Sequence, residues 1–134
     1  SIASGGNYNV VLGDEAGTAI TTGDRNVTVG FEAGTAITTG GSNIAIGYQA
    51  LKTEDAHGLN VAIGEEALET LNAGADAYNV AVGASAGKNM TTGIRNILVG
   101  GLTKLCFSNR FLQHSRWLSC RSFSNYRHPK HPHW

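Results

Sequence analysis

Cysteine, proline and tryptophan are scarce in this sequence of 134 residues, which has two of each, all of them after residue 101. A repeat region without cysteine suits any redox compartment. No run of about eighteen apolar residues occurs, which excludes a membrane-spanning helix. Residues 1–20 lack the basic and apolar segments of a signal peptide. We therefore expect neither membrane insertion nor a visible leader.

Acidic residues are absent after Asp76, and this absence divides the chain. Residues 1–100 carry ten acidic and four basic side chains, a formal charge of −6, and residues 101–134 carry six basic side chains and no acid. All eighteen glycines lie within residues 1–101. We expect a boundary near Gly101, between a repeat region (1–100) and a basic tail (101–134).

One short element recurs through the repeat region, with the pattern Asn, Val or Ile, any residue, Val, Ile or Leu, Gly. The spacings between successive asparagines are 17, 17, 17, 19 and 17 residues. Such a period indicates stacked coils. The six copies are Asn9–Gly13, Asn26–Gly30, Asn43–Gly47, Asn60–Gly64, Asn79–Gly83 and Asn96–Gly100.

The alternation inside each copy predicts a short strand with one buried face. A strand of about four residues needs a partner, and the obvious one is the same strand in the next coil. Val27, Ile44 and Val61 should therefore form one column. The glycine after each strand permits the positive φ of a corner. The fold class expected is an all-β, parallel β-solenoid.

Further positions of the unit support the coil. An alanine three residues after each of the first five glycines should be buried, and the position seven after the glycine is apolar in four coils: Ile20, Ile37, Leu71 and Met90. Glu54 breaks that column, so we expect the third coil to open or to turn this side chain outward. Thr-Thr-Gly segments are typical of turns. The aligned asparagines should hydrogen-bond internally, as a ladder or as turn caps, with surface recognition as the alternative.

The fourth coil deviates from the others. Residues 65–71 favour a single helical turn because they contain good helix formers. A two-residue insertion should lie within residues 73–76, either as a tolerated loop or as a binding loop.

A coil of 17 residues encloses few apolar side chains, so a single column should be marginal in stability. Association of chains would bury a second apolar face. The middle position of the strand is apolar or small in five coils (Val11, Ala45, Ala62, Ala81 and Leu98, with Thr28 the exception), and we expect it to contact a neighbouring chain. A parallel homotrimer is the hypothesis.

The segment Asn43–Leu51, read as N-I-A-I-G-Y-Q-A-L, resembles the repeats of YadA-like trimeric adhesin heads and of bacteriophage and cyanophage tail fibres. The resemblance covers residues 7–100. It implies a left-handed parallel β-roll, three chains wound about one axis, and an extracellular or virion-associated role in attachment to a host cell receptor or glycan. The motif residues would hold the coil. Glu54 and the tail depart from the pattern.

The tail loses the period and leaves three interpretations open. The first interpretation is a shifted reading frame or a cloning artefact. The second is a genuine basic and aromatic segment that caps the rod or binds a partner, and the third is a functional site. For a site, the candidates are two cysteines and three histidines, which would suit a transition metal although their spacing matches no zinc pattern: Cys106, Cys120, His128, His131 and His133. Six positive charges predict only non-specific attraction to nucleic acid.

No constellation in the repeat region supports catalysis, a metal site or a cofactor. His57 is its one histidine, which excludes a Ser-His-Asp arrangement, and we expect it in an exposed loop. Neighbouring acids such as Glu54 and Asp55 should be solvated, with nothing to separate their pKa values. We expect a structural, adhesive fibre segment. The alternatives are a flat binding module for glycan or ice, motivated by exposed threonines, and a fibre-borne depolymerase, for which no positive sign exists.

Overall fold

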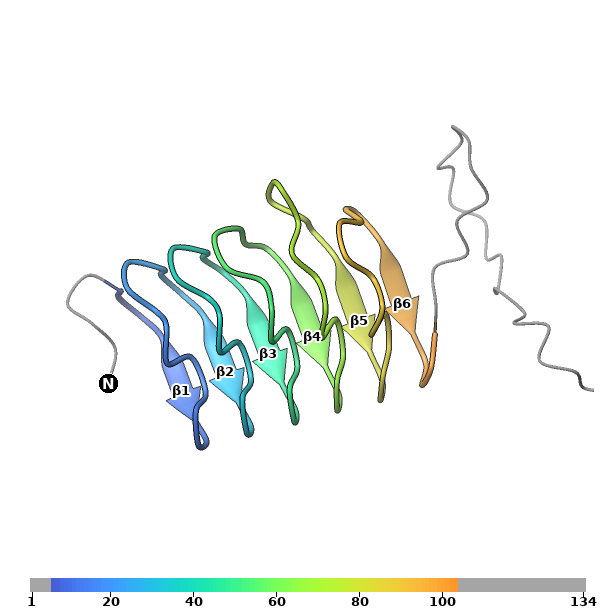
Figure 1. The fold of residues 1–134 in the computed structure, drawn as a ribbon, viewed down its shortest axis with the longest axis horizontal. Coiled ribbons are helices and arrows are strands. Elements are labelled where there is room, and N and C mark those ends of the chain that lie inside the picture. The colour runs from blue at the N-terminus through green and yellow to red at the C-terminus, as the bar shows by residue number, and fades with distance from the viewer. Residues whose placement is uncertain (1–5, 104–134) are drawn as a thin grey trace, which may run out of the picture.

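A computed structural model of the chain describes residues 6–103, and these form an elongated β-solenoid (Figure 1). Each coil contributes one three-residue strand, and the strands lie side by side in sequence order in a single six-stranded sheet. The strands are β1 (Val10–Leu12), β2 (Val27–Val29), β3 (Ile44–Ile46), β4 (Val61–Ile63), β5 (Val80–Val82) and β6 (Ile97–Val99). The predicted fold class is confirmed. We number the coils 1–6 by the strand that each contains.

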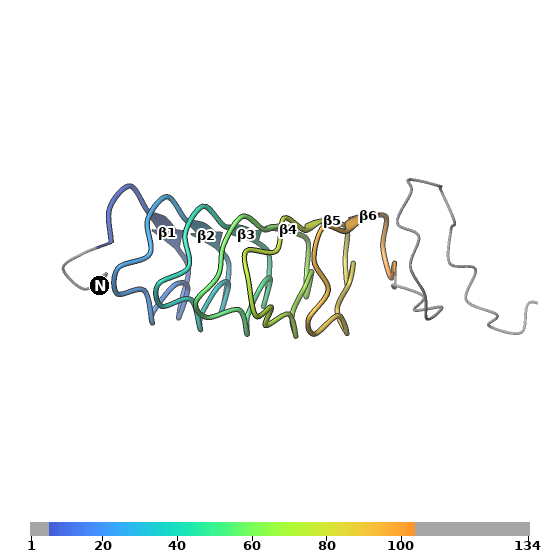
Figure 2. The ribbon, with the colours of Figure 1, turned by 90° about the horizontal axis from the view of Figure 1, so that it is seen from above.

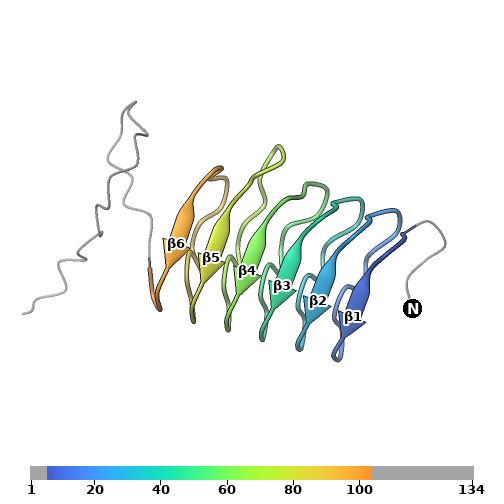
Figure 3. The ribbon, with the colours of Figure 1, turned by 180° about the vertical axis from the view of Figure 1, so that it is seen from behind.

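Every strand pairs in parallel with the equivalent strand of the next coil. Val27 pairs with Ile44 and Ile44 with Val61, which confirms the predicted register. The views from above and from behind show the sheet along one side of the rod and the turns closing each coil on the other sides (Figures 2 and 3). Backbone hydrogen bonds also join neighbouring coils outside the strands, for example Gly34 N–H to Ala50 O at 2.9 Å.

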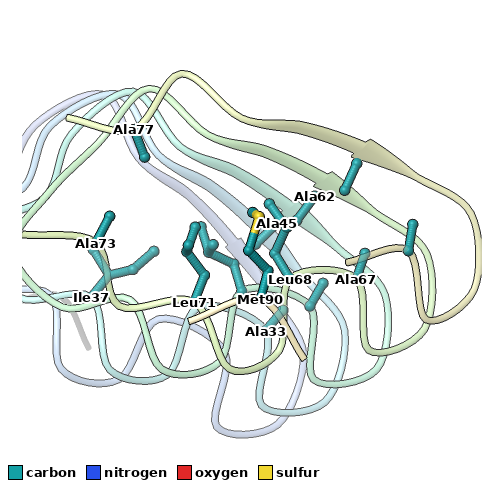
Figure 4. Close-up of a cluster of buried hydrophobic side chains, with 14 of the residues drawn as sticks. Ala33, Ile37, Ala45, Ala62, Ala67, Leu68, Leu71, Ala73, Ala77 and Met90 are labelled. Carbon is teal, nitrogen blue, oxygen red and sulfur yellow. The ribbon is translucent and has the colours of Figure 1, made fainter. Parts of the chain in front are cut away.

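The strand faces are inverted relative to the prediction. The middle residue of the strand points into the coil and is buried in β2 to β6, whereas the flanking Val and Ile residues lie on the outer face. Ala45 and Ala62 lie within the interior cluster in Figure 4. The prediction that the middle residues contact a neighbouring chain is therefore wrong. A narrow coil has room for alanine, and the larger side chains are left outside.

The interior consists of further columns that run along the rod. Ile20, Ile37, Leu71 and Met90 are buried, as predicted, and so are the alanines at the first turn. Leu51 and Leu68 add large side chains at a position where other coils have glycine (Gly17, Gly34, Gly87). Figure 4 shows Leu68, Leu71 and Met90 clustered between the sheet and the opposite wall.

The helical turn predicted for residues 65–71 is absent, and the structure has no helix within residues 6–103. Glu66 and Leu68 have φ values of 55° and 51°, which a right-handed helix does not allow. Their amides donate to the carbonyls of Tyr48 and Ala86, one in each neighbouring coil. Coil-to-coil pairing therefore overrides the local helix propensity. No helix in this part of the chain is long or apolar enough to cross a membrane.

The two-residue insertion lies in the loop after Leu71, where the sequence places it. Gly74, Ala75 and Asp76 are exposed there. The loop stands out from the edge of the rod between β4 and β5 (Figure 1). Ala73 and Ala77, at its two ends, are buried, so the insertion leaves the stack intact. Of the predicted tail, only residues 101–103 belong to the described part, and the cysteines and histidines discussed above lie outside it.

Thr28 provides a test of the inward-facing column. Its side chain is buried between Val11 and Ala45, and its hydroxyl has no hydrogen-bond partner. A buried hydroxyl without a partner costs about 1–3 kcal/mol. We expect Thr28→Val to raise the free energy of unfolding by about 1 kcal/mol, measured by urea denaturation. The matched control is Thr22→Val at an exposed turn, and equal effects of the two substitutions would contradict the inward placement.

Candidate functional site

The asparagine column is an internal ladder, which confirms the structural prediction for it. Asn26, Asn43, Asn60 and Asn79 are fully buried. The side-chain oxygen of each accepts the backbone N–H of the next asparagine, for example Asn43 N–H to Asn26 Oδ1 at 2.9 Å. The side-chain amide of Asn26 donates to the carbonyl of Gly40 at 2.8 Å. These groups are occupied within the chain and offer nothing to an external ligand.

The outer face of the sheet presents a regular row of apolar side chains. Two parallel columns run along it, from the first and the third residue of each strand. At the ends of the rod these side chains are well exposed, with Val10 at 54% and Ile97 at 78%. In coils 2–5 they are half-buried, since each is flanked by its neighbours in the stack. Val and Ile columns on an outer face are unusual for a surface in water.

Threonines line the turns, and most of their hydroxyls donate to backbone carbonyls. The hydroxyl of Thr21 donates to the carbonyl of Thr38 at 3.1 Å, and that of Thr35 to the carbonyl of Glu32 at 2.7 Å. Thr18, Thr38 and Thr39 also donate to backbone carbonyls. The donors of a flat threonine array are therefore used internally, which weakens the ice-binding alternative.

Glu54 lies inside the coil, contrary to the prediction that coil 3 opens or turns this side chain outward. It is 0% exposed and takes the place that Ile37 and Leu71 hold in adjacent coils. Its carboxylate accepts the backbone N–H of Ala73 at 3.0 Å and that of His57 at 3.3 Å. These two bonds explain how the coil accommodates the carboxylate. Burial raises the pKa of Glu54, so the prediction of a solvated acid is also wrong.

His57 is not a freely exposed loop residue. Its side chain is 33% exposed, and its Nδ1 atom is buried, 3.7 Å from Oε1 of Glu54, with no hydrogen-bond partner. Its carbonyl accepts the side-chain amide of Asn43 at 3.1 Å. Asp55 completes a group in which one ligand atom from each of the three side chains lies within 4.8 Å of the others. We call Glu54, Asp55 and His57 the coil-3 corner.

The raised pKa of Glu54 has a consequence for stability. The folded chain holds the proton more tightly than the unfolded chain, so the free energy of unfolding falls as pH rises from the unfolded pKa through the folded pKa. Glu54→Gln cannot titrate and should remove this slope.

Urea unfolding between about pH 4 and pH 8, in chelator-treated buffer, measures the slope. Glu65→Gln, at an exposed acid, should keep the slope of the parent protein. A parent-like slope in Glu54→Gln would contradict the burial of this carboxylate.

Ion pairs join neighbouring coils at the first turn after the strand. Lys52 contacts Glu32, and Lys88 contacts Glu66, each at 2.6 Å. The hydrogen bond from each lysine lowers the pKa of its carboxylate partner. Phe31 and Tyr48 stack beside the first pair, with ring centroids 5.7 Å apart, and both side chains are exposed. Surface pairs of this kind contribute little to stability.

Sequence reasoning missed the coil-3 corner, although two departures from the repeat signalled it. Glu54 replaces an apolar residue, and His57 replaces the glycine found at Gly23 and Gly40. Both departures fall in one coil, and the structure brings the two side chains together. In the described part of the chain no hydroxyl or thiol nucleophile is seen in contact with His57. None of the protein-family models, curated proteins or solved structures compared with this chain matches it.

Proposed function

We propose that this chain is a non-catalytic structural segment of a homotrimeric fibre, of the phage tail-fibre or surface-adhesin type, that supports attachment to a host cell or surface outside the cell or on a virion. The observation that carries the proposal is the outer face of the sheet, with its two continuous Val and Ile columns. A fibre segment of several chains needs such a face, because each thin coil has only a small interior of its own.

The chemistry of this face favours another copy of the chain as its partner. Copies aligned in parallel have the same spacing between coils, so each coil would lie against a coil of its neighbour. The same Val and Ile contacts would then recur along the rod. Burying such side chains is favourable by about 1.5–3 kcal/mol for each one fully removed from water. We infer three chains from the resemblance of the N-x-A-I-G repeat to trimeric adhesins and tail fibres. We infer the interface from the exposed Val and Ile columns.

Ile46 and Ile63, in neighbouring coils on the outer face, allow a direct test. The double substitution Ile46→Glu/Ile63→Glu places two charges in the proposed interface and should convert a trimer into monomers. Light scattering coupled to size exclusion measures the mass. Thr22→Glu and Asn72→Glu, at exposed turns, form the matched control and should remain trimeric. A trimer that survives the double substitution would contradict the proposed interface.

A glycan-binding module is the second candidate, and the exposed Phe31–Tyr48 stack favours it over ice binding. Aromatic rings beside the polar side chains of Gln49 and Lys52 are the kind of surface that takes apolar and hydrogen-bonding ligands together. A glycan array probed with the parent and with Phe31→Ala/Tyr48→Ala distinguishes this role. Binding that disappears in the variant would assign it, and an array without signal would remove it.

A further inference from the structure

The coil-3 corner combines a buried carboxylate, an imidazole that is 33% exposed and a second carboxylate, and the buried carboxylate stands where other coils are apolar. Coils 1, 2, 4 and 5 have Ile20, Ile37, Leu71 and Met90 where coil 3 has Glu54. An ionised carboxylate at such a position costs free energy unless it is compensated. The compensation that the chain itself supplies is two backbone amides, at 3.0 and 3.3 Å. A cation beside Glu54 would stabilise the ionised carboxylate further.

The distance between Glu54 and His57 is close to the distance between two ligands of one metal ion. Oε1 and Nδ1 are 3.7 Å apart, too far for a direct hydrogen bond. Two ligands that each lie about 2.0–2.2 Å from one tetrahedral Zn²⁺ are about 3.3–3.6 Å apart. The buried Nδ1 atom has no hydrogen-bond partner among residues 6–103 and lies near the carboxylate. A small cation between the two would satisfy both groups at once.

We propose that Glu54, Asp55 and His57 bind a divalent transition-metal cation such as Zn²⁺. One imidazole and two carboxylates form a ligand set that Zn²⁺ accepts. Asp55 is partly exposed and His57 is 33% exposed, which opens the site to solvent and gives an ion a path of entry. With three protein ligands, a fourth position is left for water.

The surrounding backbone holds the ligands in place. The carbonyl of His57 accepts from the Asn43 side chain of the ladder, and its N–H donates to Glu54. The carbonyl of Asp55 accepts the N–H of Thr38 at 2.7 Å. Ala73, at the start of the insertion loop of coil 4, donates to the other oxygen of Glu54. The cation would thus tie coil 3 to the loop of coil 4, at the corner where the repeat is irregular.

Zinc titration of the full chain, followed by calorimetry, tests this assignment. The histidines and cysteines of the tail are replaced first (His114→Ala, His128→Ala, His131→Ala, His133→Ala, Cys106→Ser and Cys120→Ser), so that they do not compete. We expect one equivalent of Zn²⁺ per chain, and binding that weakens as the pH falls, because metal ligands must be deprotonated. Glu54→Gln and His57→Gln should each weaken binding by at least about tenfold, since even outer-shell partners of a metal are worth about 10–100-fold.

Glu66→Gln is the matched control, because this acid lies at a turn of the next coil and its carboxylate binds Lys88 and Ser85. It should leave zinc affinity unchanged. A second measurement does not depend on the variants: the ring ¹⁵N resonances of His57 should shift on addition of Zn²⁺ to the parent chain. Absence of binding at millimolar Zn²⁺, unchanged affinity in Glu54→Gln, or an unmoved His57 ring would each overturn the proposal. The mass of the assembly is a separate readout, so failure here would leave the trimer proposal standing.

Discussion

Gly47→Ala should destabilise the rod by about 3 kcal/mol or more. Gly47 ends β3 with a φ of +132°, a conformation that only glycine adopts readily. A Cβ atom there would lie 2.5 Å from the carbonyl oxygen of Gly64 and 2.6 Å from its carbonyl carbon. Both atoms are backbone of the next coil, so relief of the clash requires coils 3 and 4 to separate. Strain and overpacking therefore act together.

The effect should also be local in the stack. A solenoid is stabilised by contacts between neighbouring repeats. Widening the contact between coils 3 and 4 should divide the rod into two halves, and hydrogen exchange should accelerate first at the amides that cross this contact, such as Gly64 N–H to Ile46 O. Urea denaturation measures the loss of stability.

Gly74→Ala is the control, because a Cβ at Gly74 has nothing within 4 Å and should change stability by no more than about 0.5 kcal/mol. Equal effects at the two glycines would contradict the close stacking of the corners.

Asn26→Ala should lower the free energy of unfolding by about 3 kcal/mol, since it leaves two buried backbone groups without partners. The substitution removes the acceptor for the Asn43 N–H (2.9 Å) and the donor to the Gly40 carbonyl (2.8 Å). Asn26 itself is fully buried, so water cannot replace these bonds without opening the coil. The free energy of unfolding, from urea denaturation, gives the magnitude.

Two further substitutions sharpen the test of the ladder. Asn72→Ala, on the exposed loop of coil 4, should be nearly neutral. Asn26→Asp keeps an acceptor for the Asn43 N–H but places a carboxylate against the Gly40 carbonyl, so its destabilisation should grow as the aspartate ionises with rising pH. An Asn26→Ala variant as stable as the parent would show that the ladder is not the internal structure described above.

Most of the fold could be predicted from the repeat period. The spacing of the asparagines placed all six strands and their register, because each coil must pair with an identical coil above and below it. The apolar column and the internal ladder followed from the same alignment.

The direction of the strand side chains could not be predicted in the same way. A three-residue strand shows that its middle residue opposes its flanks, but not which side is the interior. The usual rule buries the larger side chains, and the narrow coil reverses it by enclosing Ala45 and Ala62 while Ile44 and Ile46 stay outside. This reversal moves the surface expected to meet another chain from the middle positions to the Val and Ile columns.

The coil-3 corner could not be predicted from the sequence for a different reason. An acid in an apolar column is ordinarily expected to turn toward water. Here the amide of Ala73, from the irregular loop of the next coil, reaches the carboxylate and allows Glu54 to remain inside. That contact depends on the path of the insertion, which a repeat alignment does not describe. Helix propensity gave a wrong prediction at Glu66 and Leu68 for a similar reason, because their backbone amides donate to neighbouring coils.

We propose that the outer face of the sheet is buried between three copies of the chain. Sedimentation equilibrium of the unmodified protein at micromolar concentration tests it most directly. We expect a single species with three times the 14.0 kDa mass of the chain. A stable, folded monomer at that concentration would contradict the claim.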